Sequence, residues 1–168
     1  MRQGERWAAQ LRPFAGPLIV AALLVGACAC EGTPESNENA ALCDYYAEWL
    51  DVAYQLAAPQ EASFDALLAS GDLPEIEEQA GAGYERLETF LDRFANLEPP
   101  AEAKVWHASV EETARGLQGF FLLLESAAGE RDPDAVATVL DRLQFGLLVE
   151  VDQIGRQGEL LFRPCLER

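Results

Sequence analysis

Apolar side chains recur every three or four residues along most of the chain after residue 40. This spacing places them on one face of an α-helix, and no stretch alternates apolar and polar residues for long enough to form a strand. Four helical stretches cover residues 40–56, 74–96, 101–128 and 133–161. The apolar stripe of the third includes Leu123 where it widens, and the apolar stripe of the fourth ends at Leu161. The sequence therefore predicts an all-α fold built from four amphipathic helices.

Capping residues and prolines indicate where these helices begin and end. Asp132 followed by Pro133 predicts a helix start, because the carboxylate caps free backbone amides and proline suits the first helical position. Pro59 and Pro164 are expected to end the first and the fourth helix. Since the connections are short, the simplest arrangement is a four-helix, up-down-up-down bundle over residues 40–168.

The start of the chain has the pattern of an export signal. Arg2, Arg6 and Arg12 make it basic, and residues 13–30 contain no charged side chain. A basic segment followed by an apolar core is typical of a cleaved secretory signal. The uncharged run also reaches the lower limit of a membrane-spanning length, so an uncleaved helix is the alternative interpretation.

The letters VGAC at positions 25–28 resemble a bacterial lipobox. The resemblance implies cleavage before Cys28, a lipid on that cysteine, and anchoring on the extracytoplasmic side of a bacterial cell envelope. Residues 1–27 would then be the signal peptide, and the polar residues 28–39 a disordered tether. An ordinary cleavage site that releases a soluble form beginning at Cys30 is the alternative. The type resembled is the small helical lipoprotein of no assigned activity.

Two cysteines flank the predicted bundle. In a bundle of four helices the start of the first and the end of the last lie at the same end, so Cys43 and Cys165 are expected to be neighbours. Export places them in an oxidising compartment, where such a pair forms a disulfide. The state of Cys30 is left open.

The charge of the chain excludes one class of partner. The sequence has 12 lysines and arginines against 29 aspartates and glutamates, a net charge of −17, and loss of residues 1–27 makes this −19. Nucleic acid is bound through lysines and arginines that neutralise phosphates, so no nucleic-acid partner is expected. The same argument disfavours electrostatic docking on anionic lipid headgroups.

Catalytic motifs are not apparent in the sequence. The single histidine, His107, has no second histidine with which to form a di-iron site, and neither HExxH nor CxxC occurs. Local pairing of His107 with Glu111, one helical turn away, is the preferred interpretation of this residue, with a metal site as the alternative. We therefore predict no catalytic residues, no metal and no cofactor.

Three apolar residues fall on otherwise polar helix faces: Leu122 in the third predicted helix, and Phe145 and Val149 in the fourth. Coverage by another segment of this chain, or scattered exposure without a role, is the preferred interpretation of these three residues. An interface with a partner protein is the alternative, because apolar residues gathered on a polar face are typical of contact surfaces.

Phe120, Phe121 and Leu147 are candidates to line a cavity between the third and fourth helices. Glycines at 116, 119, 146, 155 and 158 either allow these helices to pack closely or leave room for a ligand. The sequence thus predicts a non-catalytic, lipid-anchored binding protein whose partner is another envelope protein. The alternative function is a carrier or sensor of a small apolar ligand held between these two helices.

Overall fold

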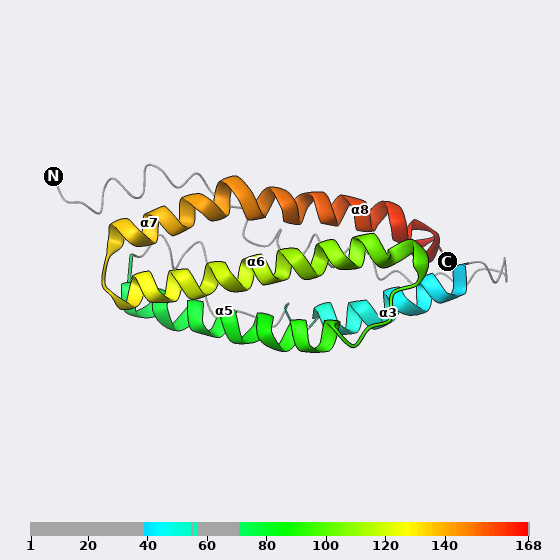
Figure 1. The fold of residues 1–168 in the computed structure, drawn as a ribbon, viewed down its shortest axis with the longest axis horizontal. Coiled ribbons are helices and arrows are strands. Elements are labelled where there is room, and N and C mark those ends of the chain that lie inside the picture. The colour runs from blue at the N-terminus through cyan, green and yellow to red at the C-terminus, as the bar shows by residue number, and fades with distance from the viewer. Residues whose placement is uncertain (1–38, 55, 57–70, 168) are drawn as a thin grey trace.

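The computed structural model describes residues 39–54, 56 and 71–167, and these residues are almost entirely helical, with no β-strand among them (Figure 1). This confirms the all-α prediction. A short 3₁₀ turn, η3, precedes the longest helix, and a π-helical segment, η4, joins two others. The elements in chain order are α3 (Ala40–Tyr54), α5 (Leu73–Phe94), η3 (Ala101–Ala103), α6 (Lys104–Gly129), α7 (Pro133–Arg142), η4 (Leu143–Leu147) and α8 (Leu148–Leu166).

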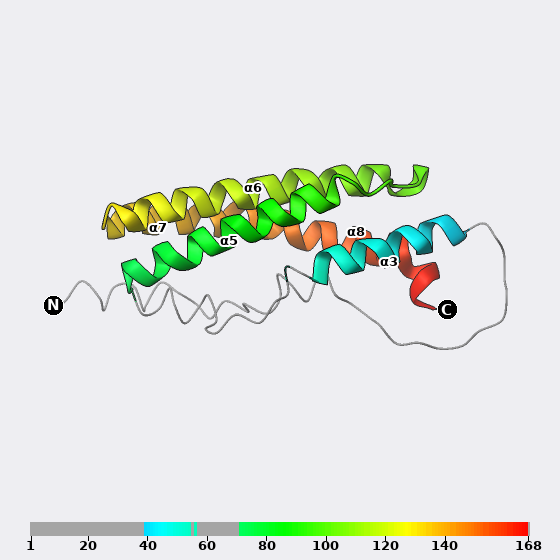
Figure 2. The same cartoon turned by 90° about the horizontal axis from the view of Figure 1, so that it is seen from below.

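The two long helices α5 and α6 lie side by side and run in opposite directions (Figure 1). After a turn, α7, η4 and α8 follow one another back along α6. The shorter α3 packs against α8 and α5, in the half of the molecule where the C-terminus lies (Figures 1 and 2). Only that half therefore has α3 beside the other helices.

Two aspartates explain where α5 and α7 begin. Asp72 Oδ1 accepts a hydrogen bond from the backbone N–H of Glu75 (3.3 Å). Asp132 Oδ1 accepts bonds from two backbone N–H groups in the first turn of α7, both at 3.0 Å. A proline follows each aspartate within the first helical turn. The predicted start at Asp132 and Pro133 is confirmed.

The hydrophobic core has two parts, which we call the large and the small core cluster. The large cluster joins α3 to the C-terminal half of α5, the N-terminal half of α6, and α8, and it is rich in aromatic rings. The small cluster consists of Ile76, Ala80, Phe120, Leu124, Ala127, Ala128, Val136 and Leu143. Leu117 and Phe121 of α6 pack against both clusters.

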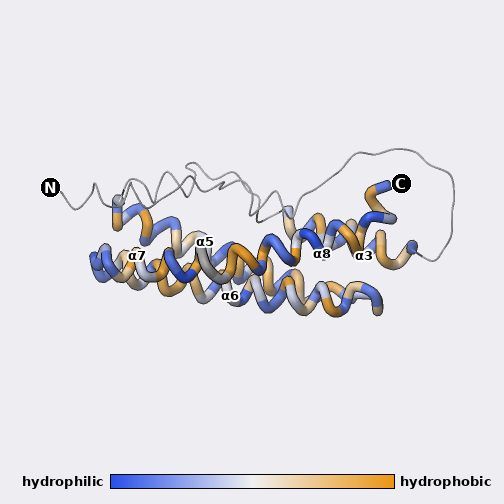
Figure 3. The backbone as a smooth tube through the Cα atoms, turned by 90° about the horizontal axis from the view of Figure 1, so that it is seen from above, coloured by the Kyte–Doolittle hydropathy of each residue, from blue (hydrophilic) through white to orange (hydrophobic). Residues whose placement is uncertain are grey.

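Polar and apolar residues alternate along the helices, as the colours of Figure 3 show.

The expected fourth helix differs from the prediction in two ways. It is not one continuous α-helix, because the π-helical segment η4 interrupts it between α7 and α8. It also continues past Pro164 to Leu166. Proline removes the donor to the carbonyl of Leu160, but Leu160 and Pro164 are both exposed, so water can satisfy that carbonyl. Near this end Phe162 is 2% exposed, whereas Leu161, which the periodicity placed in the core, is only partly buried.

Close helix contacts depend on particular glycines. A Cβ atom added at Gly83 of α5 would lie 2.7 Å from the ring of Phe121, and one at Gly116 of α6 would lie 2.8 Å from Leu147. The prediction that the third and fourth helices pack closely is thus confirmed at Gly116. The prediction is wrong at Gly119 and Gly146, where an added Cβ atom would meet nothing within 4 Å.

Candidate functional site

The predicted interface residues differ in how the structure places them. Leu122 on α6 is 52% exposed and Val149 on α8 is 59% exposed. The structure does not describe the side chain of Phe145, which belongs to η4. Two of the three predicted residues therefore have large apolar surfaces open to solvent, on two different helices.

Sequence reasoning missed a further exposed residue beside Leu122. The apolar stripe of α6 was expected to include Leu123, yet this side chain is 50% exposed. Phe120 and Leu124 occupy the core-facing side of the helix at this level, with exposures of 5% and 0%. Successive residues are about 100° apart around a helix, so Leu122 lies opposite that side and Leu123 lies at its edge. We call these two residues the Leu122–Leu123 surface.

The residues predicted to line a cavity belong to, or pack against, the small core cluster. Phe120 and Phe121 meet edge to face, with ring centroids 5.2 Å apart. The ring of Phe121 fills the space above Gly83, and Leu147 fills the space above Gly116. The structure thus brings Phe120, Phe121 and Leu147 to one region, and it shows each of them in contact with packed neighbours.

The predicted disulfide is confirmed. The sulfur atoms of Cys43 and Cys165 are 2.09 Å apart, and their Cα atoms are 5.3 Å apart. The bond joins the first turn of α3 to the last turn of α8 and closes a sequence separation of 122 residues. Both ends of the helical domain are therefore covalently linked.

His107 is a packing residue in an aromatic environment. Its Nδ1 and the hydroxyl of Tyr45 are 2.8 Å apart in a hydrogen bond, and its ring stacks on Phe94 with centroids 4.1 Å apart. Burial lowers the pKa of His107 below 6.5, against a smaller opposing effect of the Glu111 carboxylate. The expected pairing of His107 with Glu111 is therefore wrong, because the side chain that hydrogen-bonds to His107 is that of Tyr45. No group of three or more metal-ligating side chains occurs in the described part of the chain.

Two tryptophans extend the aromatic core beside His107. The indole N–H of Trp106 donates to the carbonyl of Ile154 at 3.1 Å and so ties α6 to α8. Trp49 of α3 meets Trp106 edge to face, with centroids 5.1 Å apart. Its indole N–H is buried, and no acceptor for it occurs among the described residues. Such rings gain most of their stabilisation from burial, so this aromatic cluster stabilises the contact of α3 and α8 with α6.

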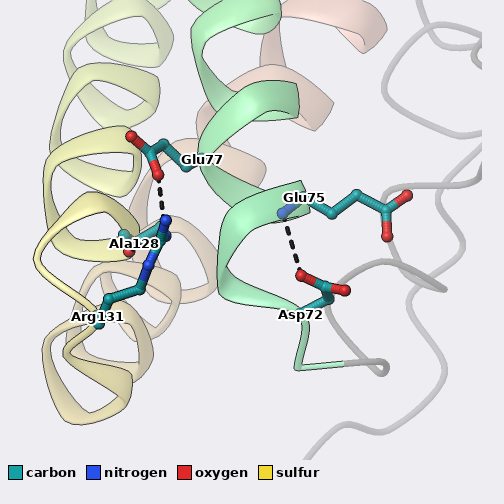
Figure 4. A network of polar contacts seen from close by, with 5 residues as sticks. All are labelled: Asp72, Glu75, Glu77, Ala128 and Arg131. Carbon is teal, nitrogen blue, oxygen red and sulfur yellow. Dashed lines mark hydrogen bonds and ion pairs between the residues drawn. The ribbon is translucent and has the colours of Figure 1, made fainter.

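A network of polar contacts lies at the opposite end of the molecule (Figure 4). Arg131, in the turn after α6, has a positive φ of 58°. Its guanidinium contacts a carboxylate oxygen of Glu77 on α5 and the carbonyl oxygen of Ala128, both at 2.9 Å. The second contact neutralises the negative end of α6. Because Arg131 and Glu77 are about half exposed, the pair positions the turn more than it stabilises the fold.

The predicted site of the lipid anchor, Cys28, lies with the rest of residues 1–38 outside the described residues. Among the helices that are described, none is long and apolar enough to cross a membrane. Comparison with known proteins gives no matching family, no matching curated protein and no matching solved structure.

Proposed function

We propose that this protein is a lipid-anchored, extracytoplasmic helical protein that acts by binding another protein of a bacterial cell envelope. The observation that carries the proposal is the Leu122–Leu123 surface, where two large apolar side chains at consecutive positions of α6 are each about half exposed. Exposed apolar residues in adjacent positions lose contact with water when a partner covers them, which stabilises a complex. Val149 on α8 is a second contact point.

We further propose that the described helices form the up-down-up-down bundle, with α7, η4 and α8 together as its fourth helix. Two features support this arrangement. The antiparallel pair α5 and α6 forms its centre, and the disulfide between Cys43 and Cys165 joins the ends that such a bundle brings together. The bundle then presents the outer side of α6 to a partner.

The lipid anchor at Cys28 rests on the lipobox resemblance. The disulfide agrees with it, because disulfides persist in oxidising compartments outside the cytoplasm. Replacement of Cys28 with alanine should abolish labelling by radioactive palmitate and release the protein from membranes, or leave its precursor uncleaved. Continued labelling of this variant would place the lipid on Cys30 or on another residue.

The contacts of the single histidine, His107, agree with a role without catalysis. His107 contacts Tyr45 and Phe94, and burial lowers its pKa, so it supports the aromatic core. General acid–base catalysis needs a group that reaches a substrate proton. The function is therefore best described by what the surface binds.

The binding proposal is tested with Leu122→Asp and Leu123→Asp combined in one variant. Capture of partners from the native envelope, with identification by mass spectrometry, should lose a protein that the wild type retains. The matched control is Val105→Asp with Leu160→Asp, which adds the same charge at two other exposed apolar positions, 79% and 65% exposed. Thermal unfolding of both variants should change little, by about 0.5 kcal/mol per site.

Two results would contradict the interface. One is recovery of every wild-type partner by the Leu122→Asp, Leu123→Asp variant. The other is equal loss of partners in both variants, since this would attribute the effect to added charge alone.

The alternative function, carriage of a small apolar ligand between the third and fourth predicted helices, has less support, because the ring of Phe121 and the side chain of Leu147 fill the spaces above Gly83 and Gly116.

A further inference from the structure

Leu122 lies close to the border between α6 and α5. A Cβ atom added at Gly81 of α5 would lie 3.2 Å from Oε1 of Glu125. One added at Gly129 of α6 would lie 3.2 Å from Oε1 of Glu77. These two contacts show which sides of the two helices adjoin. Because Leu122 precedes Glu125 by three residues, it lies one helical turn away on the same side of α6.

Acidic side chains of α5 lie across this border from Leu122. Glu85 follows Gly81 by four residues, so it lies one turn further along α5. Since α5 and α6 run in opposite directions (Figure 1), that turn of α5 is level with Leu122 on α6. Glu88 lies at the next turn of α5, and both glutamates are exposed. Leu122 is therefore bordered by Glu125 on its own helix and by two glutamates of the neighbouring helix.

These three carboxylates have no basic partner within the described part of the chain, where the four ion pairs use other acidic residues. Arg115, seven residues before Leu122, already pairs with Glu111 at 2.6 Å. A partner that covers Leu122 also takes nearby carboxylates out of water, which is unfavourable unless they are paired. We call the following residues the acidic border of the Leu122–Leu123 surface: Glu85, Glu88 and Glu125.

The acidic border decides between candidate occupants of this surface. In a symmetric dimer the same patch of both copies forms the interface, so the acidic borders of two copies would come together. Like charges brought together in an interface weaken it, and the net charge of −17 adds repulsion between whole molecules. An anionic lipid surface is disfavoured for the same reason. The occupant that fits is a protein segment with basic side chains beside apolar ones.

We propose that the partner of the Leu122–Leu123 surface presents apolar side chains bordered by lysine or arginine, and that these basic groups pair with the acidic border. Leu123 lies on the side of Leu122 that points away from α5, so the apolar and the acidic parts of the surface adjoin. An amphipathic helix with basic residues along one edge of its apolar stripe has the matching distribution. The inference rests on the proposed interface and specifies the chemistry of its partner.

The charge pairing is tested by fluorescence anisotropy with the full-length protein and a labelled helical peptide of leucine and lysine. The peptide carries leucines on one face and lysines along the edges of that face. Glu85→Gln with Glu125→Gln removes two charges from the acidic border. The matched control, Glu150→Gln with Glu159→Gln, removes two charges from exposed positions of α8. Thermal unfolding of both variants should match that of the wild type, because these substitutions lie at the surface.

The wild type should bind this peptide more tightly than a counterpart with glutamate in place of every lysine. Glu85→Gln with Glu125→Gln should weaken binding about fivefold, the factor that corresponds to the loss of two exposed ion pairs. The control variant should weaken binding less than about twofold, because charges far from the peptide are screened by salt. A higher salt concentration should reduce the difference between the two variants.

A third variant, Leu122→Ser with Leu123→Ser, removes apolar surface without a change of charge and so separates this inference from the proposed interface. Loss of peptide binding in this variant, with full binding by Glu85→Gln, Glu125→Gln, would overturn the acidic border and leave the apolar interface intact. Equal weakening by the border variant and its α8 control would also overturn the inference, since net charge alone would then explain binding. Unchanged binding by the serine variant would overturn both the inference and the interface.

Discussion

Removal of the disulfide should cause a large loss of stability. The bond between Cys43 and Cys165 closes a sequence separation of 122 residues, nearly the whole helical domain. On the chain-entropy model, a cross-link over a loop of this length stabilises the folded state by about 5 kcal/mol at 25 °C, because it restricts the unfolded chain. Since a domain has a free energy of unfolding of about 5–15 kcal/mol, Cys43→Ala with Cys165→Ala should remove a large part of it.

Urea unfolding followed by circular dichroism measures this loss. With a slope of about 2 kcal/mol per molar urea, the midpoint should fall by about 2–3 M. The slope should rise as well, because an unfolded chain without the cross-link is more expanded and exposes more surface. The control is the wild type with a thiol reductant, whose midpoint should coincide with that of the double variant.

A decrease of less than about 1 kcal/mol would refute the reasoning. It would mean that the unfolded state keeps the two ends of the domain close without a covalent bond. A large decrease in the double variant, with no change on reduction of the wild type, would also contradict it, because the loss would then arise from the alanine side chains.

Two further predictions concern packing and pH. Gly83→Ala should lower the free energy of unfolding by about 1–3 kcal/mol in thermal melts, because its Cβ atom would lie 2.7 Å from the ring of Phe121; a gain in stability would show that the two helices separate freely. Burial lowers the pKa of His107 in the folded state, so below pH 6.5 the unfolded state takes up the proton first and the fold loses stability. As the pH falls from about 7 to about 5.5, the free energy of unfolding of the His107→Gln variant should therefore decrease less than that of the wild type, as measured by urea unfolding. Equal decreases would contradict the lowered pKa of His107.

Much of the helical architecture could be predicted because the responsible signals are local. The start of α7 follows from Asp132 and Pro133, whose cap and fixed φ act within one turn. The disulfide followed from a simple rule about where the ends of four helices lie, and the structure confirms the pair. Such features depend on few residues, so a single sequence is enough to find them.

The features that were missed depend on neighbours distant in sequence. The apolar spacing through Leu143 and Leu147 fits a continuous α-helix, so nothing local indicates a π-helical segment there. Leu161 and Phe162 are adjacent, and Phe162 is the more buried because rings of α3 and α6 surround it. Leu123 is exposed because Phe120 and Leu124 occupy the core-facing side of α6. Each outcome is decided by packing partners that periodicity does not reveal.

The position of the disulfide also has a mechanical consequence. Cys43 is the fourth residue of α3, so a pulling force applied through the chain before Asn39 can unwind little more than the first turn before it reaches the covalent bond. From there the load divides between the remainder of α3, with Tyr45 and Trp49 in the large core cluster, and Cys165 at the far end of α8. A domain attached in this way can be pulled at its N-terminal side without being unravelled from that side.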